Sequence, residues 1–424
     1  MIDRPEGGER AVLVHINFPA GGMQEDLAEF QELARSAGAE VVDVVTGARN
    51  APEAKFFVGT GKAEEIRVAA QAHGAELVIF NHALSPAQER NLERLLQARV
   101  IDRTGLILDI FAQRARSFEG KLQVELALLN HLASRLVRGW THLERQRGGI
   151  GLRGPGETQL EVDRRLIRGR IKYIKERLVK VRTRREQSRH ARRRAAAPTV
   201  ALVGYTNAGK STLFNLLTGA DVYVANRLFA TLDPTLRRME VPEIGTIVLA
   251  DTVGFIRHLP HDLVEAFQAT LEEVCEADLL LHVVDAHDPQ KQANIDQVQT
   301  VLESIGATEV PQLMVYNKID LCPELSSGVD YDADGNAWRA FVSAEKSLGI
   351  NELQAAMINW LGKDVIQRAI ILTPTDAKVR AELYRLHAVL SEELDTEGNW
   401  HLVVRLPKPE WEKLFSSKNR NNYS

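Results

Sequence analysis

The segment Gly204–Ser211, Gly-Tyr-Thr-Asn-Ala-Gly-Lys-Ser, has the residue types and spacing of a phosphate-binding loop. It follows an apolar run, Thr199–Val203, which is typical of a strand buried on both faces, and it precedes the helical pattern Thr212–Leu217. The glycines allow backbone N–H groups to curl around a phosphate, and the next helix adds a positive dipole there. We therefore expect Lys210 to reach the β- and γ-phosphates of a nucleotide and the Ser211 hydroxyl to ligate Mg²⁺.

A second pattern, Asp251-Thr-Val-Gly254, follows another apolar run, Thr246–Ala250. An acid at the end of a strand beside a phosphate loop can hold Mg²⁺, here through a water molecule. Gly254 has no side chain, so its backbone N–H can approach the γ-phosphate. The D-x-x-G pattern is weak by itself and strong at this distance after a phosphate loop.

The segment Phe229–Thr235 lies between these two motifs and offers a threonine hydroxyl as another Mg²⁺ ligand. We favour Thr231 for this role, with Thr235 as the rival. A loop held only through Mg²⁺ and the γ-phosphate orders with the triphosphate and relaxes after hydrolysis.

The choice of base depends on two later motifs. In Asn-Lys-Ile-Asp, residues 317–320, the Asp320 carboxylate can accept hydrogen bonds from N1–H and the 2-amino group of guanine, and adenine offers neither. Asn317 can bond the base edge or tie loops together, and the stem of Lys318 can cover the ring. The Ala344 N–H, in a turn after another predicted strand, can meet the guanine O6.

Four motifs in this order, each after a predicted strand, indicate a P-loop domain that binds GTP and hydrolyses it to GDP, over residues 196–362. The expected ligands of Mg²⁺ are Ser211, Thr231 and Asp251, and the residues expected to act in hydrolysis are Lys210, Thr231 and Gly254. The residues expected to contact the nucleotide are Gly204, Tyr205, Thr206, Asn207, Ala208, Gly209, Lys210, Ser211, Thr212, Phe229, Ala230, Thr231, Leu232, Asp233, Asp251, Thr252, Val253, Gly254, Asn317, Lys318, Ile319, Asp320, Ser343, Ala344 and Glu345.

The residue after Gly254 bears on the rate of hydrolysis. Many small GTPases have a glutamine there that orients the attacking water, whereas Phe255 cannot hydrogen-bond to water. We predict slow hydrolysis in isolation, accelerated when a partner orders the switch loops. The alternative is that another polar side chain, such as His258, orients the water unaided.

The net charge of −4 conceals a basic region. Residues 161–195 contain 15 Lys or Arg and only four Asp or Glu, so this segment carries +11 and the remainder −15. Apolar residues recur at steps of three and four over 122–143 and again over 160–181, with the glycine-rich segment 148–156 between. The pattern predicts an antiparallel helical hairpin over residues 113–195.

Two interpretations of this hairpin remain open. One is a structural coiled coil with a solvated basic face. The other is an arm that touches nucleic acid, and it is favoured by Arg145, Arg147 and Arg153 at the tip because phosphate binding scales with the cations presented.

The two ends of the chain have different patterns. Residues 1–112 alternate strand-like and helical segments, which predicts an α/β domain, and residues 363–424 predict a small α+β domain with a helix over 376–390. The only cysteines, Cys275 and Cys322, have no metal-ligand spacing, and apolar runs are far shorter than a membrane span. We expect a cytoplasmic, monomeric protein that is not inserted in a membrane.

Taken together, the phosphate loop, Phe-Ala-Thr-Leu-Asp-Pro-Thr (229–235), Asp-Thr-Val-Gly-Phe (251–255) and Asn-Lys-Ile-Asp (317–320) resemble the Obg–HflX branch of GTPases. The segment 148–163, Gly-Gly-Ile-Gly-Leu-Arg-Gly-Pro-Gly-Glu-Thr-Gln-Leu-Glu-Val-Asp, resembles the HflX family in particular. The resemblance covers nearly the whole chain.

This resemblance implies an N-terminal α/β domain, a helical hairpin, a G domain and a small C-terminal domain. It also implies binding to the large ribosomal subunit and its rRNA, stimulation of the GTPase by the ribosome, and splitting or rescue of stalled ribosomes under stress. Two rival functions remain: a regulatory GTPase acting on a membrane-protein or protease partner, and the GTPase module of an RNA-modifying enzyme. Some relatives of the second kind carry a catalytic cysteine in a C-terminal motif, and this chain has no cysteine after Cys322.

Overall fold

In the computed structural model the described residues are 8–18, 27–135, 159–194, 197–219, 228–241, 244–257, 271–362, 365–386 and 388–415. The chain forms two compact units. Unit 1 comprises residues 1–181, 225–233 and 257–269, and unit 2 comprises residues 182–224, 234–256 and 270–424.

Unit 1 begins with a four-stranded parallel sheet in the order β2-β1-β3-β4. Its strands are β1 (Arg10–Asn17), β2 (Glu40–Ala48), β3 (Leu77–Phe80) and β4 (Arg99–Asp102). Its helices are α1 (Leu27–Ser36), α2 (Thr60–Ala72), α3 (Pro86–Leu96) and α4 (Arg103–Arg114). The predicted α/β character is present, although the sequence pattern did not indicate β4 or α4.

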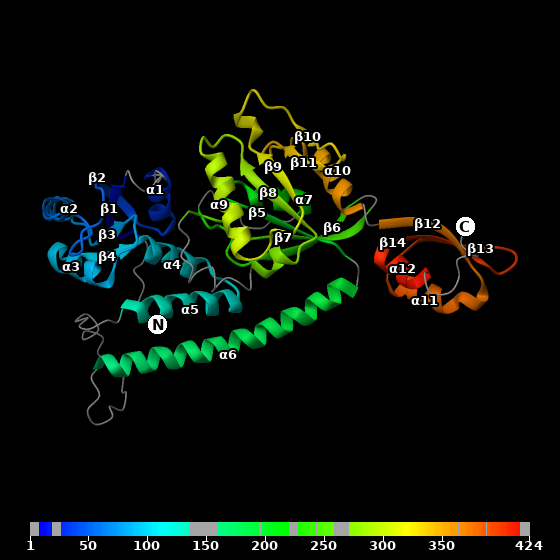
Figure 1. Ribbon diagram of the computed structural model, residues 1–424, viewed down its shortest axis with the longest axis horizontal. Coiled ribbons are helices and arrows are strands. Elements are labelled where there is room, and N and C mark those ends of the chain that lie inside the picture. The colour runs from blue at the N-terminus through cyan, green and yellow to red at the C-terminus, as the bar shows by residue number, and fades with distance from the viewer. Residues whose placement is uncertain are drawn as a thin grey trace. The chain divides into compact units, whose positions relative to one another are not determined.

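The part of the predicted hairpin that the structure describes is a pair of antiparallel helices. Helix α5 (Phe118–Arg135) lies along the N-terminal part of α6 (Gln159–Arg194), as Figure 1 shows. Leu122 and Leu126 of α5 pack against Ile174 of α6 in an apolar seam. The seam follows the predicted spacing, which places one apolar stripe of each helix against the other.

Buried charges fix the end of α5 to the sheet of unit 1. The Arg135 guanidinium lies 2.6 Å from the carboxylate of Asp102 and 2.9 Å from that of Glu89, and all three side chains are almost fully buried. Asp102 also accepts a hydrogen bond from the Gly105 N–H at the start of α4. A buried charge is tolerated when it is paired in this way.

Unit 2 is built around a seven-stranded sheet in the order β10-β11-β9-β8-β5-β7-β6, in which β6 and β10 are antiparallel to their neighbours. The strands are β5 (Thr199–Gly204), β6 (Thr235–Val241), β7 (Gly245–Asp251), β8 (Leu279–Asp285), β9 (Gln312–Asn317), β10 (Gly328–Tyr331) and β11 (Ala337–Phe341). The helices are α7 (Lys210–Thr218), α9 (Lys291–Ser304), η3 (Ile319–Leu321) and α10 (Ile350–Leu361). The central strands β5 and β8 are nearly continuous apolar runs because helices cover both faces of the sheet.

The C-terminal part of unit 2 has a three-stranded antiparallel sheet in the order β12-β14-β13, packed against two helices (Figure 1). Its elements are β12 (Val365–Leu372), η5 (Pro374–Asp376), α11 (Ala377–Arg385), β13 (Val389–Leu394), β14 (Trp400–Pro407) and α12 (Lys408–Phe415). The helix predicted over 376–390 is confirmed as far as Arg385 and is wrong beyond it. The chain turns at Leu386, and β13 then pairs with β14 over the same core.

Candidate nucleotide-binding site

The phosphate loop of unit 2 needs glycine at both ends for steric reasons. Gly204, at the end of β5, has a φ of +146°, and a Cβ there would lie 2.2 Å from the carbonyl oxygen of Val283. Gly209, with a φ of +92°, precedes α7, and its Cβ would lie 2.2 Å from Nδ2 of Asn317. The phosphate loop is therefore packed both against β8 and against Asn317 at the end of β9, and these two contacts fix its curvature.

Lys210 opens α7 and lies inside the loop. Its Nζ donates hydrogen bonds to the carbonyl oxygens of Gly204 (3.0 Å) and Tyr205 (2.7 Å), and the residue is only 6% exposed. Burial lowers the pKa of Lys210 to about 8, while the carboxylate of Asp251 acts in the opposite direction. The ammonium group is thus held inside the loop by the two carbonyl oxygens, and its contact with nucleotide phosphates stays a prediction.

Asp251 and Ser211 come together as the spacing predicts. Asp251 ends β7 and is fully buried, and its Oδ2 accepts a 2.7 Å hydrogen bond from the Ser211 hydroxyl. Thr252 is also buried and donates to the carbonyl oxygen of Leu202 (2.5 Å), which fixes the start of this loop to β5. A hydroxyl and a carboxylate side by side are hard oxygen ligands of the kind that Mg²⁺ prefers, so this donor pair fits the metal.

Gly254 lies directly over the phosphate loop. A Cβ at this position would lie 2.9 Å from Cγ2 and 3.0 Å from Cα of Thr206 and 3.1 Å from Nζ of Lys210, so a side chain would press on the phosphate loop. The backbone on either side is paired, because the Thr206 N–H donates to the Phe255 carbonyl oxygen (2.8 Å) and the Phe255 N–H to that of Gly204 (3.1 Å). The Phe255 ring is 1% exposed and belongs to the core.

The base-recognition loops meet at Asn317. Its Nδ2 donates to the Ala208 carbonyl oxygen (2.9 Å), and its Oδ1 accepts from the Ala344 N–H (2.9 Å). Of the two roles left open for Asn317, the structure shows the one that ties loops together. The Ala344 N–H, expected to meet the guanine O6, is donated to Asn317 here.

Asp320 lies beside the same junction. Its Oδ1 accepts a 2.5 Å hydrogen bond from the hydroxyl of Ser343, which is fully buried. Lys318 has a φ of +64° and its Nζ donates to Asp285 (2.7 Å), so its stem is held across the loop. The Ser343 hydroxyl orients the carboxylate that is expected to face the base edge.

The segment Leu228–Asp233 belongs to unit 1, and two of its side chains are engaged there. The Asp233 carboxylate accepts hydrogen bonds from the N–H groups of Arg116 and Ser117 (2.8 Å each) and from the Ser117 hydroxyl (2.5 Å). The Phe229 ring packs edge-on against Phe111, with the ring centres 4.7 Å apart. Sequence reasoning placed both residues at the nucleotide and missed these partners, which lie more than 100 residues away along the chain.

The two threonine candidates for Mg²⁺ differ in their surroundings. Thr235 is the first residue of β6 and pairs with Asp251 in the sheet, so its backbone is fixed. Thr231 lies in the segment before β6, outside any helix or strand. The preference for Thr231 stays a prediction, as do the contacts of Ala230 and Leu232.

Comparison of the sequence with known proteins points to one family. Residues 24–112 match the model of the GTP-binding GTPase N-terminal region, 114–192 that of the GTP-binding GTPase middle region, and 199–318 that of the 50S ribosome-binding GTPase. The chain is 58% identical to GTPase HflX of Escherichia coli K12 over 98% of this chain and 97% of that protein. It is 47% identical to GTPase HflX of Caldanaerobacter subterraneus over 92% and 89%, and 46% identical to that of Magnetococcus marinus over 96% and 94%. The chain belongs to the HflX family of GTPases. Its nucleotide site is therefore a GTPase site.

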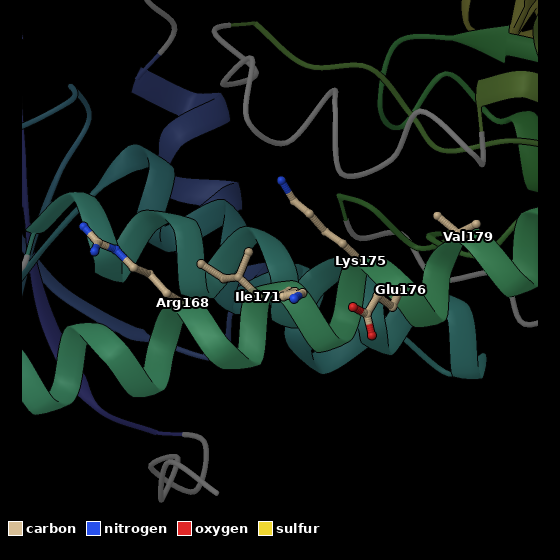
Figure 2. Close-up of a pocket in the computed structure, with 6 residues that line it drawn as sticks. Arg168, Ile171, Lys175, Glu176 and Val179 are labelled. Carbon is tan, nitrogen blue, oxygen red and sulfur yellow. The ribbon is translucent and has the colours of Figure 1, made fainter.

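Helices α5 and α6, called the arm from here on, carry a second candidate surface in this HflX-family chain. On α6 a shallow hollow of about 510 Å³ is lined by Arg168, Ile171, Lys172, Lys175, Glu176 and Val179. Figure 2 shows Ile171, Lys175 and Val179 rising from the same side of the helix, with Glu176 turned away from them. Three cations around two apolar side chains suit a polyanion. Arg145, Arg147, Arg153 and His258 lie outside the described residues.

Among the residues that the structure describes, no helix combines the length and hydrophobicity that crossing a membrane requires.

Proposed function

We propose that this HflX-family GTPase binds the ribosome, mainly through the large subunit and its rRNA, and couples GTP binding and hydrolysis to the splitting or rescue of stalled ribosomes under stress. The ribosome as partner is supported by the 50S ribosome-binding GTPase model, which matches residues 199–318. The basic arm supplies the cations that such a partner attracts. Action as a monomer in the cytoplasm is part of the proposal.

The observation that carries this proposal is the burial of Phe255. The side chain of the residue after Gly254 packs into the core, and the polar groups that Phe255 brings to the phosphate loop are those of its backbone. A GTPase without a water-orienting side chain at this position hydrolyses slowly until something else orders its switch segments. A ribosome that supplies this order would make hydrolysis depend on binding, which is the coupling that the proposed function requires.

In the proposed site Lys210 stabilises the charge that develops on the phosphates. Ser211, Thr231 and Asp251, the last through water, would hold Mg²⁺, which when bound neutralises phosphate charge. The Gly254 N–H approaches the γ-phosphate. The Asp320 carboxylate, which the Ser343 hydroxyl orients, accepts hydrogen bonds from N1–H and the 2-amino group of guanine. Burial of Lys210 and Asp251 strengthens these interactions because water does not screen them.

The test is co-sedimentation of the full chain with separated subunits and whole ribosomes, in GDP and in a non-hydrolysable GTP analogue. The proposal expects nucleotide-dependent migration with the large subunit and with whole ribosomes, and conversion of whole ribosomes to subunits with the GTP analogue. It also expects GTP hydrolysis to rise severalfold when ribosomes are added. Equal migration in both nucleotides, no subunit conversion and unchanged hydrolysis would overturn it.

A further inference from the structure

One flank of the α5–α6 pair carries exposed aromatic rings interleaved with guanidinium groups. On α6, the Arg170 and Arg177 guanidinium carbons lie 5.3 Å and 5.2 Å from the centre of the Tyr173 ring. Arg177 also lies 5.9 Å from the centre of the Phe118 ring, at the start of α5. We call Phe118, Arg170, Tyr173 and Arg177 the aromatic–arginine face.

The position of this face is set by the packing of the two helices. Residues 170, 173 and 177 lie three and four apart, so they share one side of α6, next to the buried seam that contains Ile174. Glu125 of α5 holds Arg170 through two hydrogen bonds of 2.7 Å and 2.9 Å. The guanidinium beside the Tyr173 ring is therefore fixed before any partner binds.

The rings themselves remain open to solvent. Tyr173 is 43% exposed and Phe118 is 58% exposed. The apolar seam does not need either ring, because it is closed by Leu122, Leu126 and Ile174. Large aromatic side chains kept at a surface and bracketed by arginines form a stacking platform, on which a planar base can lie against a ring or a guanidinium.

The charge around the face selects the chemistry of the partner. Residues 161–181 contain eight Lys or Arg and three Asp or Glu. A strongly basic helix attracts phosphates, and the addition of exposed aromatic rings suits unpaired nucleotides of structured RNA, which proteins bind by stacking. Aromatic and arginine side chains also occur in protein interfaces, but the excess of positive charge over residues 161–181 favours a polyanion as the partner.

We propose that the aromatic–arginine face binds an unpaired nucleotide of RNA, with the base stacked against Tyr173 and Arg177 and the adjoining phosphate held by Arg177, while Glu125 keeps Arg170 in place beside the ring. This inference rests on the proposed function, since it names a contact through which the arm would engage ribosomal RNA. It is separate from the prediction for Arg145, Arg147 and Arg153, because all four residues of the face lie in helices that the structure describes.

The test measures binding of the full chain to large subunits, with the GTP analogue, and to a labelled RNA hairpin with an unpaired loop. Tyr173→Ala is expected to weaken both by roughly 5- to 100-fold, the range for one stacked base. Tyr173→Phe is expected to bind like the wild type, and Tyr173→Leu like Tyr173→Ala. Hydrolysis without ribosomes stays unchanged in all three variants, which verifies folding.

Two variants that each lose one positive charge distinguish binding at the aromatic–arginine face from general electrostatic attraction of RNA to α6. Arg177→Gln and Lys175→Gln each remove one cation, the first within the face and the second in the hollow on another side of α6. The proposal expects the larger loss for Arg177→Gln. Equal losses, wild-type binding by Tyr173→Ala, or full binding by Tyr173→Leu, which would indicate an apolar protein contact, each overturn it.

The two ligands also separate this inference from the proposed function. If the wild type binds the RNA hairpin but not ribosomes, the proposed function fails, and the Tyr173 variants still decide the face through the hairpin. If the wild type binds ribosomes but not the RNA hairpin, or if Tyr173→Ala binds both ligands as the wild type does, the proposal for the aromatic–arginine face is wrong while the proposed function stands.

Discussion

The nucleotide site and the helical arm hold their charges in opposite ways. At the nucleotide site Lys210 is 6% exposed, Asp251 is fully buried, and each has partners within the same unit. On the arm Tyr173 is 43% exposed, and cations follow one another along the solvent side of α6. The charged side chains of the nucleotide site are held by contacts within the chain, whereas those of the arm are exposed and, in our proposal, contact a partner. The two regions should therefore fail differently when they are mutated.

The largest expected effect is that of Lys210→Ala. It removes the cation that the loop carbonyls hold in place, so GTP turnover should fall by roughly 100-fold or more. Turnover is measured as phosphate release with and without ribosomes. Lys175→Ala, which removes a cation from the arm, serves as the control and should leave turnover without ribosomes unchanged. Undiminished hydrolysis by Lys210→Ala would contradict the assignment of the site.

The next effect concerns the base. Asp320→Asn keeps the shape of the side chain and should weaken GTP binding roughly 10- to 100-fold, because a charge-assisted pair of hydrogen bonds is lost. The affinity for xanthosine triphosphate should rise, since its 2-oxo group can accept a hydrogen bond from the new amide. Competition between the two nucleotides measures the change. If the preference for GTP persists, Asp320 does not recognise the base.

The motifs of the nucleotide site were predictable because their chemistry is local. A phosphate loop needs Gly204, Gly209, Lys210 and Ser211 at fixed spacing between a strand and a helix, and the structure has that arrangement. The apolar seam of α5 and α6 was predictable for the same reason, since its period is that of the helix. Where a function is set by short spacing, the sequence is sufficient.

The failures of prediction come from contacts between distant segments. That Phe229 and Asp233 contact the nucleotide stays a prediction, but the sequence did not indicate their contacts with Phe111 and with the residues just before α5, because no local pattern marks partners so far away in the chain. The predicted helix over 376–390 continued through residues that instead pair with β14, because sheet pairing overrides helical propensity. The aromatic–arginine face was also missed, since it depends on the register of two helices.

A smaller effect is expected from three arginines in the segment between α5 and α6, outside the described residues. Replacement of Arg145, Arg147 and Arg153 by Gln should weaken ribosome binding and reduce the slope of log affinity against log salt by about 2 to 3, if each contacts one phosphate. Affinity for large subunits at several salt concentrations gives this slope. Hydrolysis without ribosomes should not change, in contrast to Lys210→Ala. An unaltered slope would mean that these three arginines do not contact phosphates.

The smallest expected effect tests burial at the nucleotide site itself. His282 of β8 is 1% exposed, and burial, with a contribution from the Lys210 ammonium, lowers the pKa of its imidazole to about 4. The unfolded chain then binds more protons than the folded chain between about pH 4 and pH 6.5, so stability is lost as the pH falls through this window. Between pH 7.5 and pH 5.5 this group should cost about 1 kcal/mol of unfolding free energy.

His282→Gln removes the titrating group and should flatten the pH dependence of the urea midpoint, whatever its effect on stability at pH 7.5. The exposed His287, changed to Gln in the same way, is the matched control, because its removal takes a titratable group from the surface of the same domain. The readout is the difference in midpoint between pH 5.5 and pH 7.5 for the three proteins. If His282→Gln keeps the slope of the wild type, the imidazole accepts a proton in the folded state, and the interior beside the phosphate loop is more polar than the burial of Lys210 and Asp251 implies.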